Sequence, residues 1–219
     1  RKEGLSDSSI NSYTRTLKCF LSWCNEEGYT KANLKIYKAA ETVKETYTDE
    51  QLELMRDNCN EPRDLAMIDL LASTGMRVGE MVLLNKEDIN FEERECVVFG
   101  KGDKERVVYF DARTKMHLQN YLRLRTDENN ALFVSLSAPY KRLEIGGVEV
   151  RLRKIGKELG IAKVHPHKFR RTLATMAIDK GMPIEQLQQL LGHQRIDTTL
   201  QYAMVKQSNV KIAHRKYIG

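Results

Sequence analysis

Residues 164–202 have the sequence VHPHKFRRTLATMAIDKGMPIEQLQQLLGHQRIDTTLQY, and much of the fold class follows from this stretch. Pro166 and Pro183 stand where helices begin, since proline at the first helical position loses no backbone hydrogen bond. Gly181 and Gly192 stand where these helices end, because glycine tolerates the left-handed conformation found after a helix. A third helix opens shortly before the stretch ends. We therefore predict three short helices here and a mainly helical domain.

The sequence upstream of residue 164 indicates further helices and one small sheet. Pro62 opens a helix that Gly75 ends, and a short helix follows from about Arg77. Residues 95–99 and 106–110 are β-forming runs on either side of a glycine-rich turn, which is the pattern of a β-hairpin. The expected fold class is therefore mainly α with a small antiparallel β-sheet, an α+β architecture.

Three more elements are expected between the hairpin and the last helices. Asp111 caps a helix that carries Met116 and Tyr121. Residues 132–134, Leu-Phe-Val, resemble a strand, and residues 148–159 place apolar side chains at helical spacing.

The sequence pattern at the start of the chain indicates a segment separate from the rest. Residues 8–27 form a helix, residues 29–46 have weak periodicity and indicate a linker, and Thr48-Asp49-Glu50-Gln51 is a capping-box pattern that opens a new domain. We expect residues 1–46 to be one segment and residues 47–219 a second domain with a C-terminal tail. The first helix has a broad apolar face with little chain nearby to cover it. That face consists of Ile10, Tyr13, Leu17, Phe20, Leu21 and Cys24.

The composition favours a globular protein with an anionic partner. Lys and Arg total 36 against 30 Asp and Glu, a net charge of +6, which suits nucleic acid but is also common in proteins without such a partner. Cys19, Cys24, Cys59 and Cys96 lack metal-site spacing and indicate free thiols in a reducing cytoplasm, two of them in the core. No stretch approaches the roughly 18 apolar residues that cross a bilayer. The chain starts at Arg1 without a leader, so we expect a cytoplasmic fragment without membrane contact.

Arg77, Lys101 and Tyr202 could carry chemistry, yet each has an ordinary explanation when taken singly. An ion pair with Glu80, three residues on, would account for Arg77. A solvated side chain at a hairpin tip would account for Lys101. Packing of a half-buried ring within the last short helix would account for Tyr202.

His167 and Arg170 share one face at the start of a helix, a position that favours anions. A capping histidine beside a solvated arginine is the ordinary alternative. His193 follows a helix-ending glycine, where an imidazole often bonds the last carbonyl groups. A zinc site of His165, His167 and His193 is the metal alternative, but no Cys, Asp or Glu stands at a usual ligand spacing near them. We expect no metal.

Taken in order, these residues resemble the tyrosine recombinase family, in particular phage and conjugative-transposon integrases and Xer-type recombinases. The resemblance covers about residues 48–205, and its most specific part is the Leu-Gly-His stretch followed by the tyrosine. It implies the catalytic-domain architecture of that family, preceded by the last helix of a core-binding, SAM-like domain. The matching motifs are Thr74-Gly75-Met76-Arg77, Gly100-Lys101-Gly102, His167-Lys168-Phe169-Arg170, Leu190-Leu191-Gly192-His193 and Thr198-Thr199-Leu200-Gln201-Tyr202.

The resemblance implies a site-specific recombinase that cleaves and rejoins DNA through a 3′-phosphotyrosyl intermediate, in the integration or excision of a mobile element. Tyr202 would be the nucleophile, His167 the proton acceptor and Lys101 the general acid. Two arginines would clamp the phosphate and a histidine would bond it. No cofactor is implied. The full candidate catalytic set is Arg77, Lys101, His167, Arg170, His193 and Tyr202.

The resemblance also implies double-stranded DNA as the partner and a homotetramer on that DNA, with residues 203–219 exchanged between subunits. Folding of this tail back onto its own chain is the alternative. Two alternatives stay open. A type IB topoisomerase shares the chemistry, although the integrase-like spacing favours recombination. A regulator that binds DNA without cutting it is the other, although such a protein has no need of Tyr202.

Overall fold

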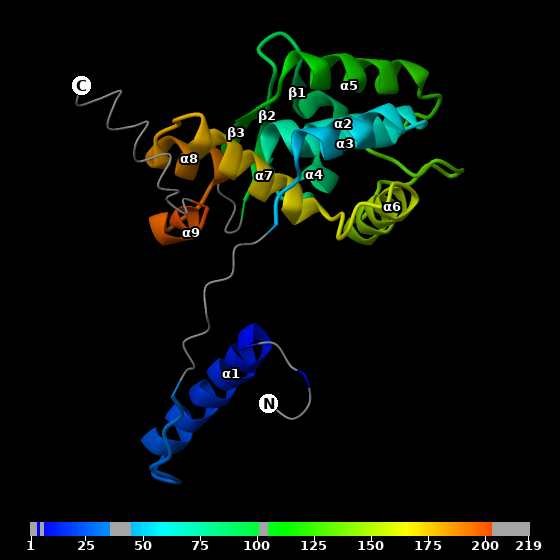
Figure 1. Ribbon diagram of the computed structural model, residues 1–219. Helices are drawn as coiled ribbons and strands as arrows, with labels where there is room; N and C mark the ends of the chain where they lie inside the picture. Colours follow the sequence, from blue (N-terminus) through cyan, green and yellow to red (C-terminus); the bar gives the residue numbers. More distant parts are fainter. Residues whose placement is uncertain (1–3, 5–6, 36–44, 101–104, 203–219) are drawn as a thin grey trace, which may run out of the picture. The chain divides into compact units, whose positions relative to one another are not determined.

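The chain divides into two compact units, residues 1–44 and residues 45–219 (Figure 1). The first contains α1 (Asp7–Glu26), which ends just before Gly28. In the described part of the chain much of the apolar face of α1 is exposed, including Tyr13, Leu17 and Phe20, and so is the neighbouring Trp23, whereas Cys24 is buried. The computed structural model describes residue 4 and residues 7–35, 45–100 and 105–202.

The second unit is mainly helical with a small antiparallel sheet, which confirms the predicted fold class. Thr48 caps α2 with the predicted capping box: its side chain accepts from the Gln51 amide, and Gln51 bonds back to the Thr48 amide. The helices are α2 (Asp49–Asp57), α3 (Pro62–Thr74), α4 (Val78–Leu83), a 3-10 turn (Lys86–Asp88), α5 (Ala112–Leu124), α6 (Ile145–Glu158), α7 (Pro166–Asp179), α8 (Ile184–Leu191) and α9 (Ile196–Leu200).

Helix α3 lies at the centre of the second unit, packed against α5 on one side and α7 on the other (Figure 1). Pro62 opens it and Gly75, with a left-handed φ of 60°, ends it, as predicted. Met67, Ile68 and Leu71 are fully buried in the main hydrophobic core. This packing fixes where the chain leaves α3, which is where the candidate site begins.

The sheet has the strand order β1-β2-β3, formed by β1 (Ile89–Asn90), β2 (Glu95–Phe99) and β3 (Glu105–Tyr109), all antiparallel. The predicted hairpin is confirmed as β2 and β3. Val98 pairs with Arg106, and Cys96 pairs with Val108. Since alternate residues share a face of a strand, Arg106 lies on the inward face with the buried Val108.

One local prediction was wrong. Residues 132–134 form no strand; only isolated bridges join Asn85 to Ala131 and Val134 to Arg142. These residues are apolar because they are buried in the core, which a strand pattern cannot distinguish. The helix capped by Asp111 is confirmed as α5, which buries the face that carries Leu118 and Tyr121 and leaves Met116 exposed.

Helices α7, α8 and α9 follow as predicted, with Pro166 opening α7 and Gly192 ending α8 in a left-handed conformation. They enclose a small second core of Ala174, Leu187 and Leu191, against which Tyr202 packs. Of the helices in the described residues, none is both long enough and apolar enough to cross a membrane.

Candidate active site

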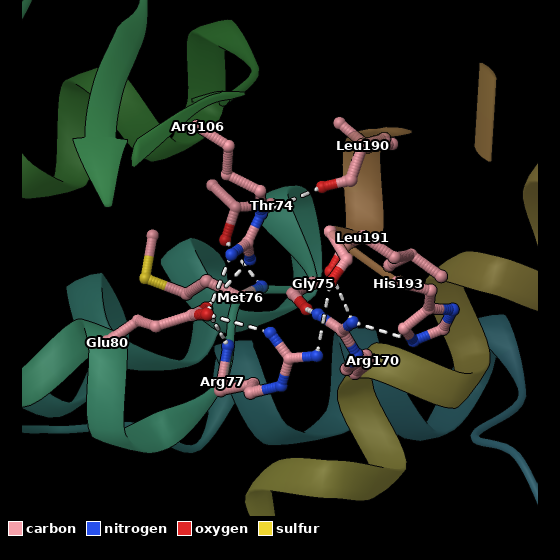
Figure 2. A network of polar contacts seen from close by, with 11 residues as sticks. Thr74, Gly75, Met76, Arg77, Glu80, Arg106, Arg170, Leu190, Leu191 and His193 are labelled. Atoms are coloured by element: carbon pink, nitrogen blue, oxygen red, sulfur yellow. Dashed lines mark hydrogen bonds and ion pairs between the residues drawn. The ribbon is translucent and has the colours of Figure 1, made fainter. Parts of the chain in front are cut away.

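Arg170 is the buried centre of the candidate site. Its side chain leaves the second turn of α7, and the residue is only 1% exposed. Nη1 donates to the carbonyl oxygen of Gly75 at 2.8 Å, and Nη2 donates to that of Leu191 at 2.5 Å (Figure 2). These oxygens lie at the C-terminal ends of α3 and α8, where the helix dipole is negative and stabilises a cation. The two helix ends thus replace the water that a buried guanidinium loses.

Arg77 reaches the same place from the start of α4. Its backbone amide donates to Glu80 Oε2 at 2.7 Å and its Nη1 donates to Glu80 Oε1 at 2.9 Å, so the ordinary ion pair is present. Nη2 also approaches the Gly192 carbonyl oxygen at 3.5 Å. The side chain nevertheless stays 44% exposed. An ion pair that leaves a guanidinium half-exposed still allows it to bind an anion from solution.

Arg106 comes to this cluster from β3. Its Nη1 and Nη2 donate to the two carboxylate oxygens of Glu80, each at 2.7 Å, and its Nε donates to the Leu190 carbonyl oxygen at 3.2 Å (Figure 2). Burial alone would raise the pKa of Glu80, but the hydrogen bonds from Arg106 and Arg77 outweigh this and lower it. Glu80 is therefore held as a carboxylate between two arginines.

The cluster has more positive than negative charge. Among the described residues, the cluster contains three guanidinium groups, from Arg77, Arg106 and Arg170, and one carboxylate, from Glu80. The cluster therefore has a surplus of two positive charges (3 − 1). Burial and the two neighbouring arginines lower the pKa of Arg170 to about 10, so it remains charged at neutral pH. An anion bound here would offset the repulsion. A phosphate suits the planar donor forks of arginine.

His193 is neutral and oriented on both sides of its ring. Its Nε2 lies 2.9 Å from Nη2 of Arg170, which can only donate, so Nε2 accepts and the ring proton lies on Nδ1. Nδ1 is 2.8 Å from the hydroxyl of Thr199, a fully buried residue. Burial, followed by the charges of the arginines, lowers the pKa of His193 to about 4. The capping interpretation was wrong for this side chain, because it bonds Arg170 and Thr199 rather than the carbonyl groups that end α8.

Tyr202 lies beside His193. Its ring stacks on the imidazole, with centroids 6.0 Å apart and planes 18° apart. It stands two residues past the end of α9, in a turn closed by a 2.9 Å hydrogen bond from its amide to the Thr199 carbonyl oxygen. The prediction had placed it inside the helix. The ordinary explanation also holds, because the Tyr202 ring is half-buried and packs against the second core. Tyr202 also lies near enough to Arg170 to influence its pKa.

The structure thus brings Arg77, Arg170, His193 and Tyr202 together. His167 lies exposed in the first turn of α7, near enough for its charge to contribute to lowering the pKa of His193. Lys101 lies outside the described residues. Among those residues, no group of three or more His, Cys, Asp or Glu is arranged to hold a metal ion.

Sequence reasoning missed the parts of Arg106 and Thr199 in this site. A signal for Arg106 existed, because it alternates with Val108 on the inward face of a predicted strand, where an arginine needs a buried partner. Nothing in the sequence pointed to Thr199, since its contact depends on how the chain turns after α8.

The fold and the site define the class of protein. The family model described as the phage integrase family matches residues 43–209. The chain therefore belongs to the phage integrase family and is a tyrosine recombinase, an enzyme that breaks and rejoins DNA.

Individual relatives support the same family assignment. The chain is 35% identical over 219 residues to tyrosine recombinase XerA of Pyrococcus furiosus, a match that covers 97% of this chain and 75% of that protein. It is 31% identical over 231 residues to tyrosine recombinase XerC of Corynebacterium glutamicum, covering 98% and 73% respectively. Its fold is similar to that of the Tn1549 transposon integrase in complex with transposon right end DNA. There the TM-score is 0.82 at 18% identity, covering 100% of this chain and 82% of the other.

Proposed function

We propose that this chain is a site-specific recombinase that cleaves and rejoins DNA strands through a 3′-phosphotyrosyl intermediate, in the integration or excision of a mobile element. One observation carries the proposal: a phenol lies beside a cluster with two surplus positive charges, built from Arg77, Arg106, Arg170 and Glu80. The names of the relatives support recombination. The transposon integrase of similar fold, solved with its transposon end DNA, supports a mobile element.

In this proposal the scissile phosphate binds between Arg77 and Arg170. Arg77 contributes exposed donors, whereas Arg170 is oriented by two carbonyl groups and contributes mainly its buried charge. His193 donates a hydrogen bond to the phosphate once its ring proton lies on Nε2, with Nδ1 then accepting from the Thr199 hydroxyl. Donors already aimed at the charge of a phosphoryl transition state need no rearrangement during the reaction, and such preorganisation is the main source of catalysis in phosphoryl transfer.

The chemical step exchanges one phosphodiester for another. The oxygen of Tyr202 forms a bond to phosphorus while the bond from phosphorus to the 5′-oxygen breaks, and the tyrosine proton leaves to His167. Lys101 protonates the departing 5′-oxygen. A tyrosine hydroxyl has an ordinary pKa near 10, so it needs such an acceptor at neutral pH. A 5′-hydroxyl from another strand then reverses the step.

The partners follow from the same proposal. Double-stranded DNA is the substrate, and four copies assemble on it, with residues 203–219 exchanged between subunits. Residues 1–46 are the C-terminal part of a core-binding domain and a linker. The uncovered apolar side chains of α1, among them Tyr13, Phe20 and Trp23, support this, because such a face is normally packed against other helices.

A suicide DNA substrate with a nick beside the cleavage site tests the proposal, because the freed 5′ fragment diffuses away and traps the covalent adduct. We expect Tyr202→Phe to abolish the adduct and to leave DNA binding nearly unchanged. The matched control is Tyr109→Phe, on an exposed tyrosine of β3. An adduct that persists in Tyr202→Phe would refute the nucleophile. No adduct in the unmodified chain would leave a DNA-binding regulator as the better description.

Two further measurements assign the acid and the reaction class. Lys101→Ala should be rescued by DNA whose leaving 5′-oxygen is replaced by sulfur, since a thiolate leaves without a proton. If this DNA does not restore cleavage by Lys101→Ala, the general acid is another residue. Strand exchange between two labelled duplexes indicates a recombinase, whereas relaxation of supercoiled DNA without exchange indicates a topoisomerase.

A further inference from the structure

Three arginines contact three successive carbonyl oxygens at the end of α8. Arg106 Nε donates to Leu190, Arg170 Nη2 to Leu191, and Arg77 Nη2 approaches Gly192, at 3.2, 2.5 and 3.5 Å. The arginines come from β3, α7 and the start of α4, so this helix end joins three separate elements (Figure 2). Residue 193, the candidate histidine, follows directly.

Arg106 differs from the other two in how its donors are used. Both terminal nitrogens bond Glu80 as a two-pronged fork, and Nε bonds Leu190, so each of its three nitrogens has a protein acceptor. Its side chain is 11% exposed, against 44% for Arg77. A guanidinium with this geometry faces the protein rather than a DNA phosphate.

The partner of Arg106 is also the partner of Arg77. Glu80 accepts from the Arg77 amide at 2.7 Å and from its guanidinium at 2.9 Å. The orientation of the exposed arginine therefore depends on a carboxylate whose own position depends on Arg106. A second connection runs through Gly192: a Cβ at this position would lie 2.8 Å from Arg106 Cδ, so the turn before His193 packs directly on the Arg106 side chain.

We propose that Arg106 is a positioning residue for DNA cleavage, acting through Glu80 on Arg77. The inference rests on the proposed function, because it concerns the rate of that reaction. The competing possibility is that Arg106 is a third phosphate ligand in its own right. The two differ in whether the effect of Arg106 requires Glu80.

A double-mutant cycle separates these possibilities. The rate of adduct formation on the suicide DNA is measured in a single turnover, with protein in excess, for Arg106→Gln, Glu80→Gln and the double variant. Because a small misplacement of a catalytic group costs about 100-fold, we expect Arg106→Gln to slow cleavage by about that factor. In the Glu80→Gln background the same change should alter the rate by no more than about twofold, since the route through Glu80 is already broken. A full 100-fold loss in both backgrounds would overturn the proposal.

Two variants control for charge and for stability. Arg106→Lys keeps the charge but not the fork, so it should be nearly as slow as Arg106→Gln. Arg113→Gln removes another arginine that pairs with a glutamate, on the exposed side of α5, and should leave the rate unchanged. If Arg106→Gln does not fold, the comparison of Glu80→Gln with the double variant still applies, because neither leaves an unpaired buried carboxylate. Full activity of Arg106→Lys would reduce Arg106 to a simple charge and contradict the proposal.

The pH profile gives a readout that a loss of packing would not move. Glu80 is faced by Arg77, Arg106 and, from α7, Arg170, and Arg106 is the strongest influence that lowers its pKa. In Arg106→Gln this pKa should rise, so the cleavage rate should increase with pH over a range where the unmodified protein is flat. The double variant, which lacks the carboxylate, should not show this rise; if it does, Glu80 is not the group involved.

The outcomes also separate the inference from the proposed function. If the unmodified chain forms no adduct, the proposed function fails. If it forms one and Arg106→Gln matches its rate, only the role of Arg106 fails.

Discussion

Nη2 of Arg170 donates a 2.9 Å hydrogen bond to Nε2 of His193, so a buried cation holds a neutral imidazole in one tautomer beside Tyr202. A protonated imidazole has no acceptor and could not keep this bond. Burial lowers the pKa of His193 most, and the contact with Arg170 lowers it further.

Protonation of His193 should therefore cost stability in acid. Its pKa falls from the usual 6.5 to about 4 on folding, because of burial and then the nearby arginines. The unfolded chain takes up this proton near pH 6.5 and the folded chain only near 4, so the stabilisation is complete above 6.5 and is lost as the pH falls between them. In His193→Gln the unfolding free energy should lack this pH-dependent contribution from the imidazole. The difference between the two proteins in urea unfolding, measured at pH 7.5, 5.5 and 4.5, should change with pH; a constant difference would contradict the assignment.

Substitution by lysine should act differently at Arg170 and at Arg77, the two arginines of the proposed phosphate site. Arg170→Lys loses a two-carbonyl contact in the core, so we expect about 3 kcal/mol less stability together with a cleavage rate reduced by at least about 100-fold. Arg77→Lys removes a half-exposed guanidinium, so the stability loss should stay under about 1 kcal/mol while cleavage falls as strongly. Thermal unfolding and single-turnover cleavage on the same preparations test this. Equal destabilisation of the two variants would show that burial does not distinguish them.

Much of the scaffold around the site was predictable because its boundaries rest on local chemistry. Pro62, Pro166, Gly75 and Gly192 stand at helix ends that the backbone alone explains. The candidate residues also follow from their motifs: Arg77, His193 and Tyr202 lie within two residues of a helix end, and Arg170 lies in the second turn of α7. What the motifs share is therefore a set of helix termini, which the core then brings to one place.

The rest depended on tertiary contacts. A two-residue strand such as β1 has no periodicity to detect, and the apolar run at 132–134 is explained by core burial rather than by pairing. Arg106 was passed over because an arginine after a hairpin turn is usually solvated. Only the packing of α8 against β3 shows that its partners are a carboxylate and a helix end.

Gly192→Ala should disturb the site more than the backbone. Gly192 has a φ of +64°, and an added Cβ would lie 2.8 Å from Arg106 Cδ. Gly160 provides a matched control, with a φ of +67° and no atom within 4 Å of the same position. Both changes should cost about 1–2 kcal/mol of stability from the left-handed backbone. Only Gly192→Ala should slow cleavage, by about tenfold or more, through displacement of Arg106. Equal cleavage rates in the two variants would show that the turn accommodates the methyl group.

Tyr47 should stabilise the start of α7, the helix that presents His167 and Arg170. Its hydroxyl accepts from the His165 amide at 3.2 Å, its backbone amide donates to the Thr172 hydroxyl at 2.8 Å, and the Lys168 ammonium lies 4.5 Å from its ring centroid. Burial raises the pKa of this hydroxyl to about 12, so it remains a neutral hydrogen-bonding group throughout the working range.

Tyr47→Phe isolates the hydroxyl, because the ring and its contact with the ammonium remain. The change leaves the amide of His165 without its partner, so we expect a loss of about 1–2 kcal/mol in unfolding free energy. Hydrogen exchange at that amide should also become faster. Tyr109→Phe, on the exposed face of β3, should change stability by less than about 0.5 kcal/mol. If exchange at His165 is unchanged in Tyr47→Phe, the hydroxyl does not hold the helix start, and any lost stability arises elsewhere.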